Sequence, residues 1–199
     1  QKALDAVPDN QGGHRIIIRP DTYAEANLYP AHKGAPGAYN VLESDWDGRL
    51  GSGATGWVVI DSGAPRVVVR TNPKALTGNP TFMTLPDGEP DKETGLKSVD
   101  WWGPWRCDPE FSAVSWDRWV FRNLYMTGGD GGLFWDATDH VKPFTVIVED
   151  CIGIGRAFGG GVANCLSRPE SPITFRRCTL WAVDWWGDTA GAYVRVENP

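Results

Sequence analysis

The sequence predicts an all-β fold in which short strands stack as a parallel β-helix, because one strand-like pattern returns along the C-terminal half. Its apolar anchors lie 27, 27 and 21 residues apart, at Phe121, Val148, Phe175 and Val196. Each anchor is followed two positions later by a polar residue, at Asn123, Asp150, Arg177 and Asn198. A repeat of about 20–50 residues built from one strand-like unit is typical of solenoids, since no unit buries its apolar face alone. An antiparallel sandwich with evenly spaced strands is the alternative interpretation.

A second, weaker repeat accompanies the first, because residues 132–136 precede the similar residues 160–164 by 28 positions. Stacked units of this kind form ladders of like residues. Cys151 and Cys178 occupy equivalent positions, so we expect both to face the core as small hydrophobic residues. A disulfide between them is the alternative. The spacing of the four cysteines fits no C-x-x-C pair and no zinc finger.

The N-terminal residues predict a cap and a first strand. Residues 1–10 place Leu4 and Val7 on one side of about two helical turns, and this short amphipathic helix is expected to cover one end of the solenoid. The apolar run within 15–19 predicts a strand that is buried on both faces. Residues 20–22 carry the turn signals that end it.

The middle of the chain is rich in loops. Residues 26–56 are dominated by Gly, Ala, Asp and Pro and predict a long loop, and strands are predicted at 57–60 and 66–70. A polar insertion follows over 71–98, with turn signals inside it. Long excursions between the units of a solenoid usually lie on one face, often the binding face.

Composition and charge exclude several classes of function. The formal net charge is −6 and the sequence pI is about 5.0, which argues against a nucleic-acid partner and gives no overall attraction to polyanions. The net charge does not exclude local pockets of basic residues. It has no run of 18 apolar residues, so no membrane-spanning helix is expected.

Eleven tryptophans are the most unusual feature of the composition. Trp101, Trp102 and Trp105 fall within five residues interrupted by Gly and Pro, and Trp185 lies beside another Trp and two acidic residues. Indole rings can plug the ends of a solenoid, because each buries a large apolar area. Exposed indole faces can instead stack on sugar rings. These four residues are therefore our candidates for substrate binding.

The opening of the chain resembles a known family. The similarity is to pectin methylesterases and related pectin-lyase-like proteins. Their capping helix is matched by residues 3–9 and their first strand by 16–18. Their Pro-Gly-x-Tyr-x-Glu turn is matched by 20–25, with Asp21 in place of Gly. The resemblance implies a right-handed parallel β-helix, here a single domain over 1–199 with long loop insertions. It also implies a polysaccharide as partner and an extracellular, periplasmic or cell-surface location.

The family's esterase site is only partly matched. Asp130 stands where the Asp of its Gln-Asp-Thr segment would be, with Gly129 in place of the Gln. Residues 151–155 are similar to the lead-in to the second catalytic Asp, but Arg156 and its neighbours follow with no Asp. One carboxylate of the pair that esterases need is thus missing. The esterase mechanism is not supported.

Polysaccharide lyases of the same fold suggest a second chemistry. They use Ca²⁺ held by carboxylates and an Arg or Lys as base. The resemblance makes Asp130 and Arg156 the candidate catalytic residues. Asp136 and Asp139 are close enough in sequence to share a hard cation, so they are the candidate Ca²⁺ ligands. The alternative is that these two aspartates cap a turn before Pro143.

Two hypotheses of function follow. The first is a carbohydrate-active or polysaccharide-binding protein with a Trp-rich groove, which as an enzyme would be a lyase or a carbohydrate esterase. The second is a non-catalytic structural or adhesive β-solenoid that self-associates. The chain stops in mid-pattern at Pro199, so we expect further C-terminal rungs or a second chain to cover its last rung.

Overall fold

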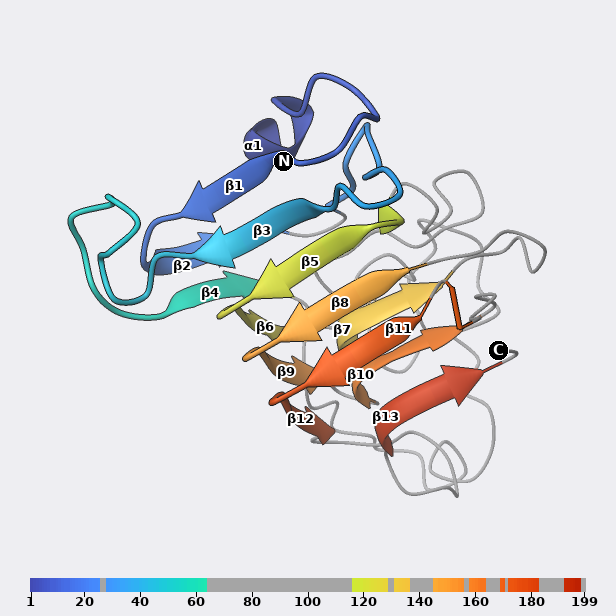
Figure 1. Cartoon of the computed structure of the whole chain (residues 1–199). Coiled ribbons are helices and arrows are strands. Elements are labelled where there is room, and N and C mark those ends of the chain that lie inside the picture. Colours follow the sequence, from blue (N-terminus) through green and yellow to red (C-terminus); the bar gives the residue numbers. More distant parts are fainter. Residues whose placement is uncertain are drawn as a thin grey trace, which may run out of the picture.

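The structure is a computed structural model that describes residues 1–25, 28–63, 116–128, 131–136, 145–155, 158–163, 169–170, 172–182 and 192–197. These residues form an all-β fold of parallel strands with one short helix (Figure 1). The predicted all-β class is confirmed, and every pairing between strands is parallel, so the antiparallel sandwich is excluded for this part of the chain.

The strands form three sheets. The first sheet has the order β1 (Arg15–Ile18), β3 (Asn40–Ser44), β5 (Trp119–Arg122), β8 (Val146–Glu149) and β11 (Ile173–Arg176). The second sheet has the order β12 (Thr179–Ala182), β9 (Ile152–Gly155), β6 (Tyr125–Thr127), β4 (Val58–Asp61) and β2 (Asp21–Ala24). The third sheet has the order β13 (Ala192–Glu197), β10 (Phe158–Ala163) and β7 (Gly131–Asp136).

The chain visits the sheets in a fixed sequence. It runs through β5, β6 and β7, then β8, β9 and β10, then β11, β12 and β13, adding one strand to each sheet on every pass. The predicted ladder of anchors is confirmed for three members, because Phe121 is paired with Val148 and Val148 with Phe175. Leu42 and Ile16 extend the same ladder toward the N-terminus.

Two details of the predicted repeat are wrong. Val196 does not join the ladder of Phe175 but lies in the third sheet, paired with Val162. In the weaker repeat Leu133 is paired with Gly160, so that repeat spans 27 residues and not 28. Both errors have one cause. Strands of the third sheet, such as β7 and β10, show no clear alternation of apolar and polar residues, so their local pattern assigns neither the sheet nor the register.

The polar column that follows the anchors forms the turn between the first two sheets. Asn123, Asp150 and Arg177 have φ angles of 55°, 55° and 53°, which is the left-handed region. The amide of Asn123 donates to the Glu149 carbonyl at 3.2 Å, and the amide of Asp150 donates to the Arg176 carbonyl at 3.2 Å. Asn and Asp tolerate this conformation better than most residues, which explains two of the three. The fourth predicted member, Asn198, lies outside the described residues.

The cysteines that follow this turn face the core as expected. Cys151 is buried and Cys178 is half-buried, and both are free thiols. Burial raises the pKa of the Cys151 thiol to about 12, so this sulfur remains protonated and unreactive at neutral pH. The interpretation as packed small hydrophobic residues is confirmed, and the disulfide is absent between these two.

The N-terminal cap is shorter than predicted. Helix α1 spans only Lys2–Asp5, but Leu4 and Val7 are buried and belong to the core, as their predicted apolar side requires. The expectation that the first strand is buried on both faces is wrong, because Ile17 points outward from β1 and is 41% exposed. The turn at 20–22 is also shorter than expected, since β2 already begins at Asp21.

The predicted loop at 26–56 contains a strand. Strand β3 occupies its centre, with buried polar residues at Asn40, Glu43 and Ser44. Their polarity conceals the strand from pattern analysis. The strand predicted at 57–60 is confirmed as β4, shifted by one residue. The strand at 66–70 and the insertion at 71–98 lie outside the described residues.

The core lies between the sheets, with Phe121, Met126 and Leu133 contributed by the first, second and third sheet respectively. Trp116 and Trp119 are fully buried there, with ring centroids 5.5 Å apart in an edge-to-face arrangement. Packing is therefore the role of these two indoles. Within the described part of the chain, no helix is long and apolar enough to cross a membrane.

Candidate functional site

The site residues predicted from the sequence fall outside the described residues, with one partial exception. This applies to the catalytic candidates Asp130 and Arg156, to Asp139, and to all four substrate-binding tryptophans, Trp101, Trp102, Trp105 and Trp185. Asp136 is the last residue of β7, and only the backbone of this residue is described. Among the residues whose side chains are described, no group of three or more His, Cys, Asp or Glu side chains could hold a metal ion.

The outer face of the second sheet carries aromatic side chains. Val58, Ile60, Met126 and Leu180 face the core from this sheet, so the residues between them face outward. Outward positions include Tyr125 on β6 and Trp181 on β12, which is 55% exposed. Trp57 directly precedes β4 in the same outward phase and is 60% exposed.

The pairing of the strands places these three aromatic residues on one diagonal. Tyr125 is aligned with Val59, so Trp57 lies one strand across and two residues back, about 8 Å away. Trp181 is aligned through Ile154 with Thr127, which puts it two strands across and two residues forward of Tyr125, about 12 Å away. The positions around the diagonal are occupied by aliphatic, hydroxyl and carboxylate side chains, at Val59, Ile152, Ile154, Thr179, Asp61 and the buried Thr127.

A buried aspartate fixes the loop that leads to Trp57. Asp45 follows β3, and its carboxylate accepts hydrogen bonds from the amides of Leu50 and Ser52, both at 2.7 Å. Burial raises the pKa of the Asp45 carboxyl, but the hydrogen bonds from Ser52 and Leu50 outweigh it and hold the pKa below its usual value. The Gly56 amide donates to the Trp46 carbonyl at 2.9 Å and closes the base of the loop. This arrangement positions both Trp46 and Trp57.

We expect Asp45→Asn to loosen this loop without unfolding the sheets. The amide side chain keeps one acceptor oxygen but replaces the other with an NH₂ group, which cannot accept the second backbone N–H. Hydrogen exchange should therefore quicken at the amide of Ser52 or Leu50, while the amides of β3 and β8 exchange as before. Because the Asp45 pKa is lowered, the native protein should show the same loosening only as the pH falls through the lowered pKa, below 3.8. Equal exchange in the two proteins would contradict the role given to Asp45.

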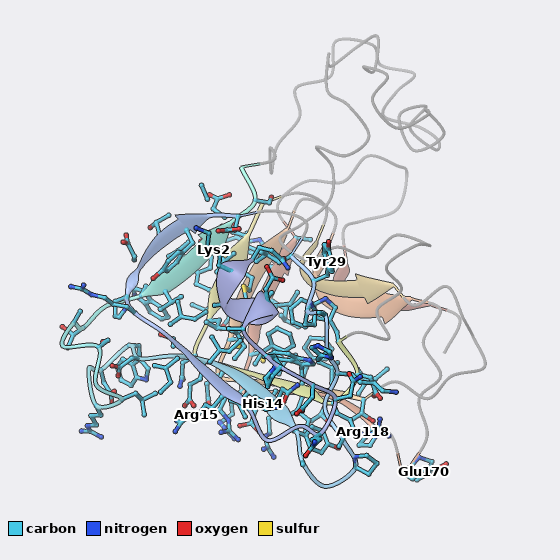
Figure 2. All side chains as sticks on the ribbon, turned by 90° about the horizontal axis from the view of Figure 1, so that it is seen from above. Lys2, His14, Arg15, Tyr29, Arg118 and Glu170 are labelled. Carbon is cyan, nitrogen blue, oxygen red and sulfur yellow. The ribbon has the colours of Figure 1, made fainter. Side chains whose placement is uncertain are left out.

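A second polar group lies beside the cap. The imidazole Nε2 of His14 is 3.1 Å from the Asp9 carboxylate, and the His14 amide donates to the side-chain oxygen of Asn40 at 3.2 Å. His14 lies next to Arg15 at the start of β1 (Figure 2). Hydrogen bonds from the Gln11 amide and from His14 lower the pKa of the Asp9 carboxyl. Asp9 and His14 thus tie residues 9–14 to β3. In the sequence His14 stands in a loop without an obvious partner, since a contact five residues away in a loop leaves no periodic signal.

No protein-family model, no curated protein and no solved structure matches this chain significantly. The resemblance of the N-terminal residues to pectin-lyase-like proteins therefore remains a prediction.

Proposed function

We propose that the chain is a right-handed parallel β-helix of the pectin-lyase-like kind, and that it binds a polysaccharide across the outer face of the second sheet. Two observations support the architecture. Each of the three passes that begin at β5, β8 and β11 adds one parallel strand to each sheet, and the first two sheets are joined by the recurring left-handed turn at Asn123, Asp150 and Arg177.

The diagonal of Trp57, Tyr125 and Trp181 carries the proposal for binding. Indole and phenol rings offer flat apolar faces with a polar group at one end, which suits sugar rings with their apolar faces and hydroxyl edges. The hydroxyls of Thr22 and Thr179, both exposed on the same face, add hydrogen-bonding groups next to the rings. An extended glycan chain is the ligand that reaches three aromatic side chains spread over about 20 Å.

Catalysis is a further part of the proposal. Asp130 and Arg156 remain the candidate catalytic residues, Asp136 and Asp139 the candidate ligands of Ca²⁺, and a location outside the cytoplasm goes with a polysaccharide partner. A product-resolved assay with and without Ca²⁺ tests the chemistry. Unsaturated ends or released ester groups that disappear in Asp130→Ala would identify the enzyme class, and their absence on every polymer would leave a binding protein.

We expect Trp181→Ala to weaken polysaccharide binding about tenfold or more, because an exposed indole is a typical anchor of such a surface. Affinity electrophoresis in gels cast with neutral and acidic polysaccharides identifies the polymer that retards the protein, and calorimetry then measures the affinity. Trp46→Ala is the matched control, since Trp46 is 52% exposed but lies on the loop and not on the sheet face. Equal losses in the two variants, or no binding to any polymer, would contradict the proposal.

Self-association is the second candidate function, and one observation favours it. The inward-facing residues of the outermost described strands β11 and β12 are only partly buried, although they pack on the core. They include Ile173, Phe175 and Leu180. A second copy stacked on these strands would cover them. Sedimentation velocity across a range of concentrations separates the two outcomes, since a monomer at all concentrations would remove this candidate.

A further inference from the structure

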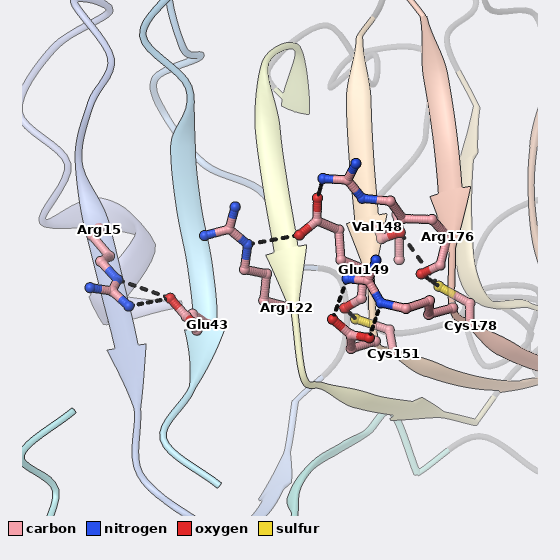
Figure 3. A network of polar contacts seen from close by, with 10 residues as sticks. Arg15, Glu43, Arg122, Val148, Glu149, Cys151, Arg176 and Cys178 are labelled. Carbon is pink, nitrogen blue, oxygen red and sulfur yellow. Dashed lines mark hydrogen bonds and ion pairs between the residues drawn. The ribbon is translucent and has the colours of Figure 1, made fainter. Parts of the chain in front are cut away.

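The outer face of the first sheet carries a row of alternating charges. Arg122, Glu149 and Arg176 occupy directly opposed positions on β5, β8 and β11, and Glu43 on β3 is aligned with Arg122. Arg15 on β1 reaches Glu43 and completes the row (Figure 3). The row crosses all five strands of the sheet.

The ion pairs hide the carboxylates and leave the guanidinium groups exposed. Arg15 donates to Glu43 from Nε at 2.9 Å and from Nη2 at 2.5 Å. Glu149 accepts from Nε of Arg122 at 3.0 Å and from Nη2 of Arg176 on its other oxygen. The side chains of Glu43 and Glu149 are 11% and 6% exposed, whereas those of Arg15, Arg122 and Arg176 are 46%, 38% and 53% exposed.

This face is therefore locally positive on a chain whose formal net charge is −6. Three guanidinium groups oppose two carboxylates, and the carboxylates lie beneath them. Arg122 and Arg176 are two strands apart, about 10 Å across the sheet, which is close enough for one extended ligand to reach both. A guanidinium has five N–H donors, and each of these arginines uses only one or two of them on its glutamate.

A row of side chains beside the charges provides a surface for a sugar ring. Val41, Val120, Ile147 and Thr174 are aligned across β3, β5, β8 and β11 and point outward with the charged residues. Val41, Ile147 and Thr174 are half-buried, and Val120 is buried. A ligand that lies along the row thus meets an apolar strip on one side and guanidinium donors on the other.

We propose that the outer face of the first sheet binds a sulfated polysaccharide, with Arg15, Arg122 and Arg176 as the residues that contact its sulfate groups. A carboxylate gains most from a side-on fork of two parallel N–H bonds. The fork that includes Nε is already used by Glu43 on Arg15 and partly by Glu149 on Arg122. The terminal N–H groups of Arg122 remain for a ligand, and a sulfate with three terminal oxygens accepts hydrogen bonds from many directions without needing the side-on fork.

This inference rests on the proposed function in one respect, since it takes the partner to be a polysaccharide. The surface is different, because it lies on the first sheet and not on the second. Dextran sulfate, polygalacturonate and uncharged dextran are suitable probes, compared by calorimetry with the full chain at low and at physiological salt. We expect dextran sulfate to bind most tightly, with an affinity that falls as salt screens the contacts. Arg122→Gln and Arg176→Gln, each of which leaves Glu149 one guanidinium partner, should each weaken this binding about fivefold.

Arg49→Gln is the matched control. Arg49 is 85% exposed and paired with Asp47 at 3.3 Å, so its loss changes the net charge equally but lies on the loop after β3. Unchanged binding in this variant, with losses in the other two, would support the face. Equal losses of affinity in all three variants would show that only the overall charge matters, and would overturn the proposal. The proposal would also be overturned if dextran sulfate did not bind, or if polygalacturonate bound with equal affinity. A loss with Trp181→Ala alone would support the second sheet instead, so the two proposals fail separately.

Discussion

Phe121→Ala is expected to lower the free energy of unfolding by about 3–5 kcal/mol, because it removes a fully buried ring and leaves a cavity that the stacked strands cannot close. Phe121 lies in the middle of the five-stranded first sheet, and its ring centroid is 5.3 Å from that of Trp116. The chain on either side is held in register by β3 and β8, which limits relaxation. Urea unfolding followed by circular dichroism measures the loss.

Phe175→Ala is the matched control for this prediction. Phe175 occupies the same ladder position two strands away, on β11 at the edge of the described sheet, and is only half-buried. The same change of side chain there removes less buried apolar area, so the loss should be clearly smaller. If the two variants lost equal free energy, the core would not be centred on β5 as the burial of its residues indicates.

Features that repeat within one sheet could be predicted from the sequence. The anchors Phe121, Val148 and Phe175 recur with one spacing, and the polar residues that follow them take the left-handed turn. The sheet that receives a strand could not be predicted, because it depends on where the chain turns. Val196 is followed by a charged and then a polar residue, as the other anchors are, yet it pairs with Val162 in the third sheet.

Buried polar residues set the second limit of the sequence analysis. Strand β3 was predicted as loop because Asn40, Glu43 and Ser44 interrupt its apolar pattern. The buried Glu43 is tolerated because Arg15, 28 residues earlier in the sequence, neutralises it across the sheet. Such a pairing depends on register between strands, which no local pattern contains.

The candidate surface was missed for a related reason. Trp57, Tyr125 and Trp181 come from three separate passes of the chain and share a face only because the register of β4, β6, β9 and β12 aligns them. The tryptophans that cluster in the sequence attracted the prediction instead. Among the indoles of the described residues, burial separates the packing role of Trp116 and Trp119 from the exposed positions of Trp57 and Trp181.

The glycines of 159–161 allow close packing between the second and third sheets. They lie within β10, and a Cβ on Gly159 would be 2.2 Å from the backbone nitrogen of Trp181. A Cβ on Gly153 would likewise be 2.2 Å from the Gly159 carbonyl oxygen. The second and third sheets thus approach each other backbone to backbone, and only glycine permits this distance.

Gly159→Ala is therefore expected to cost about 3 kcal/mol or more, since the atoms in the way belong to the backbone of β12 and cannot rotate aside. The same displacement should move Trp181 and, if the proposed polysaccharide site is correct, weaken binding there along with stability. Gly37→Ala is the control, because Gly37 has a φ of 75° with nothing within 4 Å of the added Cβ, so it bears only the conformational cost of about 1–2 kcal/mol. Denaturant unfolding of both variants measures the two losses of free energy of unfolding. A loss at Gly159 no larger than that at Gly37 would mean that β10 and β12 have room to separate, and that the position of Trp181 does not depend on this contact.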